Sequence, residues 1–509
     1  MAKMHDNGTM DNPLYTVAQL REIERAAYAA LEPGALMRRA GAAAAKYALE
    51  LLGDKRDLPV LLLAGPGNNG GDALEMAAAL ADAGIDATVL NPPGQRETSN
   101  EAASAHERAR AGTVGFIDML PPGAQWGLVV DGLFGIGLTR PIEGEYRALV
   151  AALDELRCPI LALDVPSGLD ADTGAVVGPD GIAVRATHTI TFLGDKPGLH
   201  TADGRDHAGR VEVEPLGVAP ELFPAPAARL GSAESFAGQL APRRHNTHKG
   251  SFGDVAVVGG AHGMAGAPVL AARGALFAGA GRSFVATIDP GPGYDSLQPE
   301  IMFRVADEFE FAQRTLVIGP GMGGSASAMR LLAKALDSDS PLVIDADAIT
   351  LIGASPDLAG RLAERAAPTV LTPHPLEGGR LLGTTAAAVQ ADRLAAAREL
   401  ARRSNATVIL KGSGSVIAHP DGRLLINPTG NAGLATAGSG DVLAGICGAL
   451  LAQGWPAWEA AAGSAWIHGA AADLLAAHGV GPIGMTAGEL PAAARAVINL
   501  LVAEKAGLT

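Results

Sequence analysis

Short apolar runs that end in Gly, Asp, Pro or Lys alternate with helical stretches along most of this chain. Strands of a parallel sheet are covered by helices on both faces, so they read as continuous apolar runs. Regular alternation of such runs with helical stretches is typical of doubly wound α/β folds. The sequence therefore predicts an α/β protein, with the polar ends of the runs at the carboxyl edge of a sheet, where such folds bind ligands.

The predicted strands form two groups, one in each half of the chain. Those of the first half span residues 59–63, 87–90, 127–130, 160–163 and 189–192. Those of the second half span residues 254–258, 282–288, 315–318, 341–344, 369–371, 407–410 and 415–418. Residues 18–52, which precede Gly53, and residues 73–83 are expected to be helical.

A change of composition separates the two groups. The chain has 509 residues, more than one hydrophobic core usually organises. Residues 215–244 contain Pro215, Pro220, Pro224, Pro226 and Pro242 and show no sustained period. We therefore expect a doubly wound α/β domain at 1–225, a linker at 226–240 and a second α/β domain at 241–509.

Charge and aromatic content argue against some classes of partner. Aromatic residues make up 4% of the chain, too few for stacking single-stranded nucleic acid, and the net charge of −15 disfavours nucleic acid and anionic membranes. Phosphate-bearing small molecules stay possible, because backbone amides can hold them.

The same sequence indicates a reducing compartment. Its two cysteines, Cys158 and Cys447, lie in different halves, which excludes a disulfide scaffold or a cysteine zinc site. The polar N-terminus lacks the apolar segment of a secretory signal, and no apolar run is long enough to span a membrane. We therefore expect a cytoplasmic protein.

Polar segments follow four apolar runs of the first half, at residues 68–72, 131–138, 164–168 and 196–198. The carboxyl ends of parallel strands meet, so these segments should converge on one crevice. Asn69, Asp131 and Ser167 offer oxygen atoms suited to a hard cation, and the glycines leave room for a pyrophosphate. Each segment alone could be an ordinary turn or helix cap, but four at consecutive strand ends favour a binding site.

The segment 427–448, NPTGNAGLATAGSGDVLAGICG, predicts an anion site in the second half. Gly438, Ser439, Gly440 and Asp441 stand where an apolar helix should begin, and free backbone N–H groups at a helix start attract an anion. Asp441 could then take a proton from a hydroxyl, which is the minimum for phosphoryl transfer to an alcohol. A simple helix cap is the alternative.

Other runs of the second half also end in polar loops. Lys411 is placed to neutralise phosphate charge, and the loop around Ser413 to bind a nucleotide through backbone amides. His374 stands between two prolines and could be only a turn residue. His245 and His248 are close in sequence but lack the cysteines or the HExxH context of a metal site.

The strings AGPGNNGGDALEMA, DGLFGIGLTRPIEG, DVPSGLDADTG and TFLGDKPGL resemble the YjeF N-terminal family of NAD(P)H-hydrate epimerases. The resemblance implies a Rossmann-like fold that binds K⁺ through Asn69, Asp131 and Ser167, with Asp164 as acid/base group. It also implies that the hydrated nucleotide contacts Asp164 and the following residues: Asn68, Asn69, Gly70, Gly71, Asp72, Gly135, Ile136, Gly137, Leu138, Thr139, Arg140 and Pro141.

The strings LTPHPLEGGRLLG, LKGSGSVIA and NPTGNAGLATAGSGDVLAGICGALLAQG, with residues 248–281, are similar to the ribokinase-like, ADP-dependent NAD(P)H-hydrate dehydratases. The similarity implies that Asp441 is the base and that Mg²⁺ takes part, although no residue marks a magnesium site. The hydrate would contact Gly321, His374, Pro375, Leu376, Glu377, Gly378, Gly379 and Arg380. ADP would contact Lys411, Gly412, Ser413, Gly414, Ser415, Asn431, Ala437, Gly438, Ser439 and Gly440.

Three residues depart from these family patterns. Ala73 and Leu376 stand where glycine is usual, and Ser439 replaces a threonine while keeping its hydroxyl.

Taken together, the two resemblances predict a bifunctional enzyme that epimerises hydrated NADH and NADPH and dehydrates the S form with ADP. We also expect a homo-oligomer.

Two other functions stay open at this stage. The second half could be an ordinary small-molecule kinase, which would transfer phosphate from ATP to a stable product. The first half could be a nucleotide sensor or protein-binding module, which would bind the hydrate without epimerising it.

Overall fold

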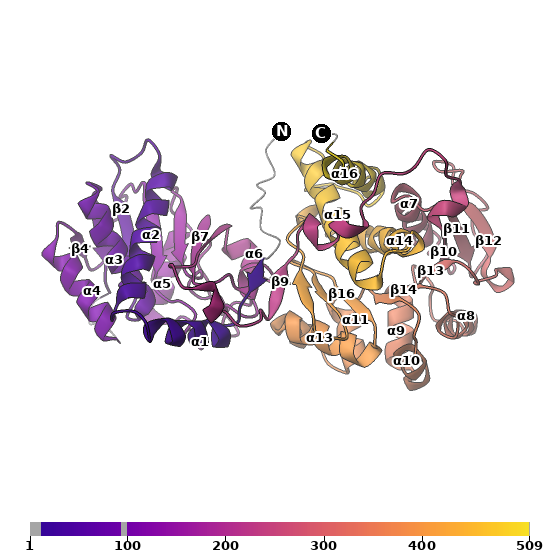
Figure 1. The fold of residues 1–509 in the computed structure, drawn as a ribbon, viewed down its shortest axis with the longest axis horizontal. Helices are drawn as coiled ribbons and strands as arrows, with labels where there is room; N and C mark the ends of the chain where they lie inside the picture. The colour runs from indigo at the N-terminus through magenta and orange to yellow at the C-terminus, as the bar shows by residue number, and fades with distance from the viewer. Residues whose placement is uncertain (1–11, 93–98, 508–509) are drawn as a thin grey trace. The chain divides into compact units, whose positions relative to one another are not determined.

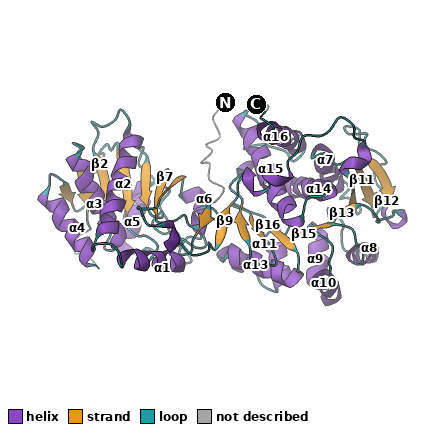
Figure 2. Cartoon of the chain, viewed as in Figure 1, coloured by secondary structure: helices purple, strands orange, loops and turns teal. Residues whose placement is uncertain are grey.

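The computed structural model describes residues 12–92 and 99–507. The described chain divides into two compact units, Asn12–Ala228 and the residues from Arg229 onward. Both units are α/β, and each has a largely parallel sheet with the helices packed on it (Figures 1 and 2). The predicted fold class is thus confirmed in both halves.

The N-terminal unit has one parallel sheet in the order β4-β3-β2-β5-β6-β7-β8. The strand order reverses between β2 and β5, and such a switch point opens a crevice at the carboxyl ends of the strands. The strands of this unit are β1 (Pro13–Leu14), β2 (Val60–Ala64), β3 (Ala87–Leu90), β4 (Gly115–Ile117), β5 (Leu128–Gly132), β6 (Ile160–Leu163), β7 (His188–Phe192) and β8 (Arg210–Glu214).

Alternate residues of β2 enter two different cores. Val60 and Leu62 pack with α2 and α3, whereas Leu61 and Leu63 pack with Val150 and other residues near α5. This double burial explains the continuous apolar run in the sequence. The helices are α1 (Val17–Tyr28), α2 (Ala35–Leu52), α3 (Asn68–Asp82), α4 (Asn100–Ala111), α5 (Gly144–Leu153) and α6 (Gly204–His207).

Two helix predictions in this unit were wrong. The helix expected at 18–52 is broken into α1 and α2, because Pro33 and Gly34 lie between them and Gly34 has φ +71°. The helix expected from Ala73 begins at Asn68 instead. Gly70 allows this early start, since a Cβ there would lie 1.8 Å from the carbonyl oxygen of Gly65.

The C-terminal unit has a sheet in the order β9-β18-β17-β16-β15-β14-β13-β10-β11-β12. The strands from β12 to β16 are parallel, and β17 runs antiparallel to both of its neighbours. The bounds are β9 (Ala228–Leu230), β10 (Asp254–Gly259), β11 (Arg282–Thr287), β12 (Met302–Val305), β13 (Thr315–Ile318), β14 (Leu342–Ile344), β15 (Thr369–Leu371), β16 (Thr407–Leu410), β17 (Val416–Ala418) and β18 (Leu424–Ile426).

Helix α14 crosses the core of this unit and packs closely on α7. A Cβ on Gly445 would lie 1.9 Å from the carbonyl oxygen of Ala271, so only glycine allows this approach. The helices are α7 (Gly266–Phe277), α8 (Ala326–Leu336), α9 (Ala346–Ala354), α10 (Pro356–Ala363), α11 (Pro375–Leu382), α12 (Ala386–Ala391), α13 (Arg393–Ser404), α14 (Ser439–Ala452), α15 (Ala457–Ala477) and α16 (Leu490–Lys505). Among the described residues, no helix is both long and apolar enough to cross a membrane.

Every predicted strand is present, with ends that differ by a residue or so. The sequence did not predict β1, β4, β8, β9, β12 and β18. Three of these, β4, β8 and β12, are edge strands with partly exposed residues, so they lack the continuous apolar run.

Residues 226–240, expected as a linker, carry local structure. Strand β9 pairs with β18, and Phe236 is buried in the core of the C-terminal unit together with Leu240. Phe236 packs against Trp455 and Trp466 at ring-centroid distances of 6.1 and 5.8 Å.

Candidate functional site

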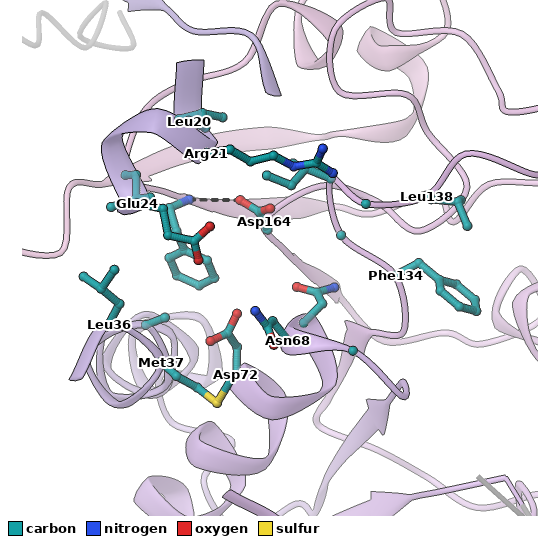
Figure 3. A pocket seen from close by; sticks show the side chains of 18 of the residues that line it. Leu20, Arg21, Glu24, Leu36, Met37, Asn68, Asp72, Phe134, Leu138 and Asp164 are labelled. Atoms are coloured by element: carbon teal, nitrogen blue, oxygen red, sulfur yellow. Dashed lines mark hydrogen bonds between the residues drawn. The ribbon is translucent and has the colours of Figure 1, made fainter. Parts of the chain in front are cut away.

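A pocket of about 760 Å³ opens at the carboxyl ends of β2, β5, β6 and β7 in the N-terminal unit. It lies at the switch point between β2 and β5, where the strand order predicts a ligand site. Helices α1 and α2 close one side (Figure 3). The predicted residues that line it are Asn68, Asn69, Asp72, Gly135, Ile136, Gly137, Leu138, Thr139, Arg140 and Asp164.

Several predicted residues lie outside the lining. Gly70 and Gly71 pack within the protein, Gly71 against Met37, and Pro141 lies against Gly178. Asp131 and Ser167 are fully buried rather than facing the pocket. Ala73 is also fully buried in α3, next to Gly132, so its methyl group does not enter the pocket.

Asp131 and Ser167 form a buried hydrogen-bonded pair. The Ser167 hydroxyl donates to Asp131 Oδ1 at 2.6 Å, and the Ser167 backbone N–H donates to Oδ2 at 2.8 Å. Burial raises the pKa of Asp131 to about 6, and the bonds from Ser167 partly oppose this. No cationic side chain pairs with Asp131 within the described part of the chain.

Asn69 has buried polar atoms without a partner. Its side chain is 7% exposed, and neither Oδ1 nor Nδ2 makes a hydrogen bond. Buried amides of this kind are rare unless a ligand or ion satisfies them. Amide and carboxylate oxygens suit a hard cation, so the chemistry of Asn69, Asp131 and Ser167 fits potassium.

Asp164 is held by a buried lysine. Lys196 Nζ lies 2.8 Å from Asp164 Oδ1 and also donates to Thr191 Oγ1 at 2.6 Å and to the carbonyl oxygens of Phe192 and Gly194, both at 3.1 Å. Figure 3 shows the Asp164 carboxylate at the pocket, where its Oδ1 also accepts a bond of 3.3 Å from the backbone N–H of Phe192. Asp164 has φ +66°, an unusual conformation for a non-glycine residue, and such strain clusters at functional sites.

Two further carboxyl groups face the same pocket. Figure 3 shows Glu24 and Asp72 pointing toward the space beside Asp164. Burial and then the charge of Asp164 raise the pKa of both groups, that of Asp72 well above its usual range. Sequence reasoning missed Glu24 because it lies on α1, away from the strand ends. The sequence did indicate the segment that contains Lys196, but it did not predict the ion pair between Lys196 and Asp164.

The C-terminal unit brings a second set of predicted residues together, at the carboxyl ends of β14, β15 and β16. Lys411 Nζ lies 2.7 Å from Asp345 Oδ1 and 4.0 Å from Glu377 Oε2. A Cβ on Gly440 would lie 3.2 Å from the same ammonium, so Lys411 also borders the first turn of α14. Burial alone would lower the pKa of Lys411, but Asp345 and Glu377 raise it overall.

Asp441 lies in the first turn of α14, beside this cluster. Burial, and then the charge of Asp345, raise its pKa to about 7, although Lys411 opposes the shift. Gly438 precedes the helix with φ +87°, and the Ser439 hydroxyl donates to the carbonyl oxygen of Leu434 at 2.8 Å. The predicted helix start is therefore present, with Asp441 in its first turn.

The loop at His374 is organised as a helix cap. His374 Nδ1 accepts bonds from the backbone N–H groups of Leu376 and Glu377, and the His374 backbone N–H donates to Glu377 Oε2 at 2.8 Å. Burial raises the pKa of Glu377 to about 7.

Leu376 is 47% exposed, so it does not fill the core. Gly378 and Gly379 are buried in α11, whereas Arg380 Nη1 donates to Thr350.

A buried arginine and a partly buried aspartate support the expected ADP loops. Arg393 is fully buried and donates to the carbonyl oxygens of Leu410 and Lys411, so it fixes the start of the 411–415 loop. Asp473 accepts bonds from the Gly430 backbone N–H at 2.8 Å and from Asn431 Nδ2 at 2.9 Å. Neither Arg393 nor Asp473 was predicted, because both lie within helices.

A protein-based magnesium site is not evident. Within residues 12–92 and 99–507, no group of three or more His, Cys, Asp or Glu side chains is arranged to hold a metal ion. Gly321 has φ +56° and lies against Met264 rather than in the carboxylate cluster.

Comparison with known proteins identifies the family. Residues 33–198 match the family described as YjeF-related protein N-terminus, and residues 255–493 match the family described as NAD(P)H-hydrate dehydratase. The bifunctional NAD(P)H-hydrate repair enzyme Nnr of Coxiella burnetii is 36% identical and covers 96% of this chain, which spans 99% of that protein. The chain belongs to the bifunctional NAD(P)H-hydrate repair enzymes.

Other members of this repair-enzyme family are equally similar. The Escherichia coli K12 enzyme Nnr is 37% identical, with 92% of this chain and 90% of that protein covered. Among solved structures, an ADP/ATP-dependent NAD(P)H-hydrate dehydratase from Bacillus subtilis, co-crystallised with ATP and Mg²⁺, is 29% identical at a TM-score of 0.46. It covers 53% of this chain, and the chain covers 97% of it.

Proposed function

We propose that the N-terminal unit interconverts the R and S forms of hydrated NADH or NADPH and that the C-terminal unit dehydrates the S form with ADP. Membership of the repair-enzyme family supports both activities. The observation that carries the second is Asp441, a partly buried carboxyl group with a pKa raised to about 7 at the start of α14, next to Lys411. A base with a pKa near the working pH is well suited to proton transfer.

In the N-terminal pocket, Asp164 is the acid/base group. Inversion at C6 of the hydrated ring needs either ring opening or loss and return of the hydroxyl, and both require proton transfer beside the ring. Asp164 faces the pocket and is fixed by Lys196. The glycine-rich loop 135–140 borders the same space and leaves room for the phosphates.

Potassium is proposed to bind below this pocket. Asn69 Oδ1, with no other partner, and the buried oxygens of Asp131 and Ser167 would hold the ion. Its charge would compensate the buried carboxylate and fix the loops that end β2, β5 and β6.

In the C-terminal unit, Asp441 takes the proton of the C6 hydroxyl. The hydroxyl oxygen then forms a bond to the β-phosphorus of ADP, and the bond from that phosphorus to the bridging oxygen breaks, releasing AMP. The amides at the start of α14 and Lys411 stabilise the charge on the phosphoryl group. Finally the C6–O bond breaks with its electron pair on phosphate, C5 loses a proton, and the double bond of NAD(P)H is restored.

Magnesium is proposed to arrive with the phosphates of ADP. This ion commonly keeps its waters and binds through substrate phosphates with one or two carboxylates, so it needs no preformed protein cage. The described residues contain no group of three or more His, Cys, Asp or Glu side chains that would form such a cage.

One experiment tests both activities. The pure protein is incubated with mixed R and S NADPH hydrate and ADP, and recovery of NADPH is followed by absorbance. We expect complete conversion. Conversion of the S fraction alone would contradict the epimerase assignment. No conversion, with transfer of phosphate from ATP to a stable product, would favour an ordinary small-molecule kinase.

A further inference from the structure

We propose that Asp345 is a positioning residue of the dehydratase site, which holds the Lys411 ammonium beside the first turn of α14, where Asp441 lies. This inference rests on the proposed function and adds a residue to that reaction. Asp345 itself does not contact the reacting atoms. It acts through the lysine.

Asp345 connects the ends of three neighbouring strands. It follows β14, its Oδ1 lies 2.7 Å from Nζ of Lys411, which follows β16, and the same oxygen accepts a bond of 2.8 Å from Oγ1 of Thr372, which follows β15. Asp345 is 1% exposed and Thr372 fully buried. A buried carboxylate with a charged and a neutral donor has a fixed orientation.

The backbone at this point is also constrained. The Asp345 N–H donates to the carbonyl oxygen of Ile318, and a Cβ on Gly319 would lie 1.8 Å from the Asp345 carbonyl oxygen. The next residue, Ala346, has φ +51°. A non-glycine residue keeps such a conformation only where its surroundings impose it, and such residues cluster at functional sites.

Lys411 is therefore placed by its partner rather than free to move. Its ammonium borders Gly440 in the first turn of α14 and lies 4.0 Å from Glu377. Without the charge of Asp345, the ammonium loses its ion-pair partner at the end of β14, and the attraction of Glu377 and Asp441 stays. Among the described residues, the charged or titratable groups that interact with Asp441 or Lys411, besides these two themselves, are Asp345, Asp347, His374, Glu377 and His468.

The charge of Asp345 also affects the base. After burial, Asp345 is the largest cause of the raised pKa of Asp441, and Lys411 opposes it. Replacing Asp345 by asparagine removes the repulsion and lets Lys411 approach Asp441. Both changes stabilise the Asp441 carboxylate, so the base becomes weaker and titrates at lower pH.

The test is the pH profile of ADP-dependent dehydration of S-NADPH hydrate by wild type and D345N. We expect kcat of D345N to fall roughly 10- to 100-fold, and the acid limb of the profile to move down by about one pH unit. A purely structural role would lower the whole profile without moving its limb. That result, or an unchanged profile, would overturn the proposal.

Two further variants separate charge from packing. T372V removes one hydrogen bond but keeps the carboxylate, so we expect a smaller loss and an unmoved limb. Above the acid limb, where Asp441 is ionised in every variant, only the position of Lys411 is compared: there the double variant D345N/K411M loses no more activity than K411M, whereas additive losses would contradict the proposal.

Urea unfolding followed by tryptophan fluorescence reports whether the C-terminal unit of each variant is folded, because Trp455, Trp458 and Trp466 lie in that unit. If D345N does not fold, T372V takes its place, and the double variant T372V/K411M is compared with T372V and K411M. Additive losses of activity in that comparison would equally overturn the assignment. If wild type itself fails to dehydrate the S-hydrate, the proposed function fails rather than the role of Asp345.

Discussion

The ammonium of Lys196 lies 2.8 Å from the carboxylate of Asp164, although the two residues follow different strands, β7 and β6. Lys196 is 1% exposed and Asp164 has a left-handed backbone, so both partners are fixed by the fold. Among the acidic groups that line the pocket, Asp164 has this cation, whereas burial and neighbouring carboxylates raise the pKa of Asp72 and Glu24. The pocket thus contains carboxyl groups in contrasting environments, which is typical of acid/base sites.

Replacing Lys196 by methionine should impair epimerisation. The aliphatic part of the side chain stays buried, but Asp164 loses its fixed partner and its orientation. We expect kcat for conversion of R- to S-hydrate to fall roughly 10- to 100-fold, with a smaller change in KM. Dehydration of S-hydrate by the other unit should be unchanged. The exposed Lys46→Met variant is the control, and an equal loss there would contradict the role of Lys196.

Potassium should stabilise the N-terminal unit through Asn69. Binding to the folded state alone raises stability by about 1.4 kcal/mol at tenfold excess over Kd. We expect KCl to raise Tm relative to tetramethylammonium chloride at equal ionic strength, and N69A to lose this increase. N68A removes a neighbouring amide that bonds to Ser99 instead, so it should keep the increase. An equal response of all three proteins would count against the site.

The sequence predicted the strands of both sheets because buried parallel strands carry an unbroken apolar run. It also placed Asp164, Asp441 and Lys411 at strand or helix ends, where the structure has them. The edge strands β8 and β12 were missed, since their exposed residues interrupt the run. The strands could thus be predicted because they are buried on two faces, rather than because of the strand propensity of their residues.

Partners that come from distant elements could not be predicted in this way. Glu24 reaches the N-terminal pocket from α1, and Arg393 reaches the 411–415 loop from α13. Each reads as an ordinary charged residue of an amphipathic helix. Their roles depend on which helix covers which strand end, and that is set by tertiary packing rather than by local sequence.

A pair of glycine substitutions should separate close packing from helix propensity in the C-terminal unit. Gly445→Ala in α14 would place a methyl group 1.9 Å from the Ala271 carbonyl oxygen, and we expect it to destabilise the unit by about 1–3 kcal/mol. Gly360→Ala in α10 meets no atom within 4 Å and should stabilise it by about 0.5–1 kcal/mol. Urea midpoints from tryptophan fluorescence measure both. A neutral effect of Gly445→Ala would show that α7 and α14 can separate at no cost.

The dehydration rate should follow the ionisation of Asp441. Burial, and then Asp345, raise its pKa to about 7, and the base acts only when ionised. The rate should therefore increase about tenfold per pH unit below 7 and level off above it. D441N should lose about 10²- to 10⁴-fold in kcat while epimerisation continues. Glu377 also has a pKa raised to about 7, mainly by burial, so E377Q is the control. If the acid limb persists in E377Q, it belongs to Asp441, and its disappearance there would assign the titration to Glu377 instead.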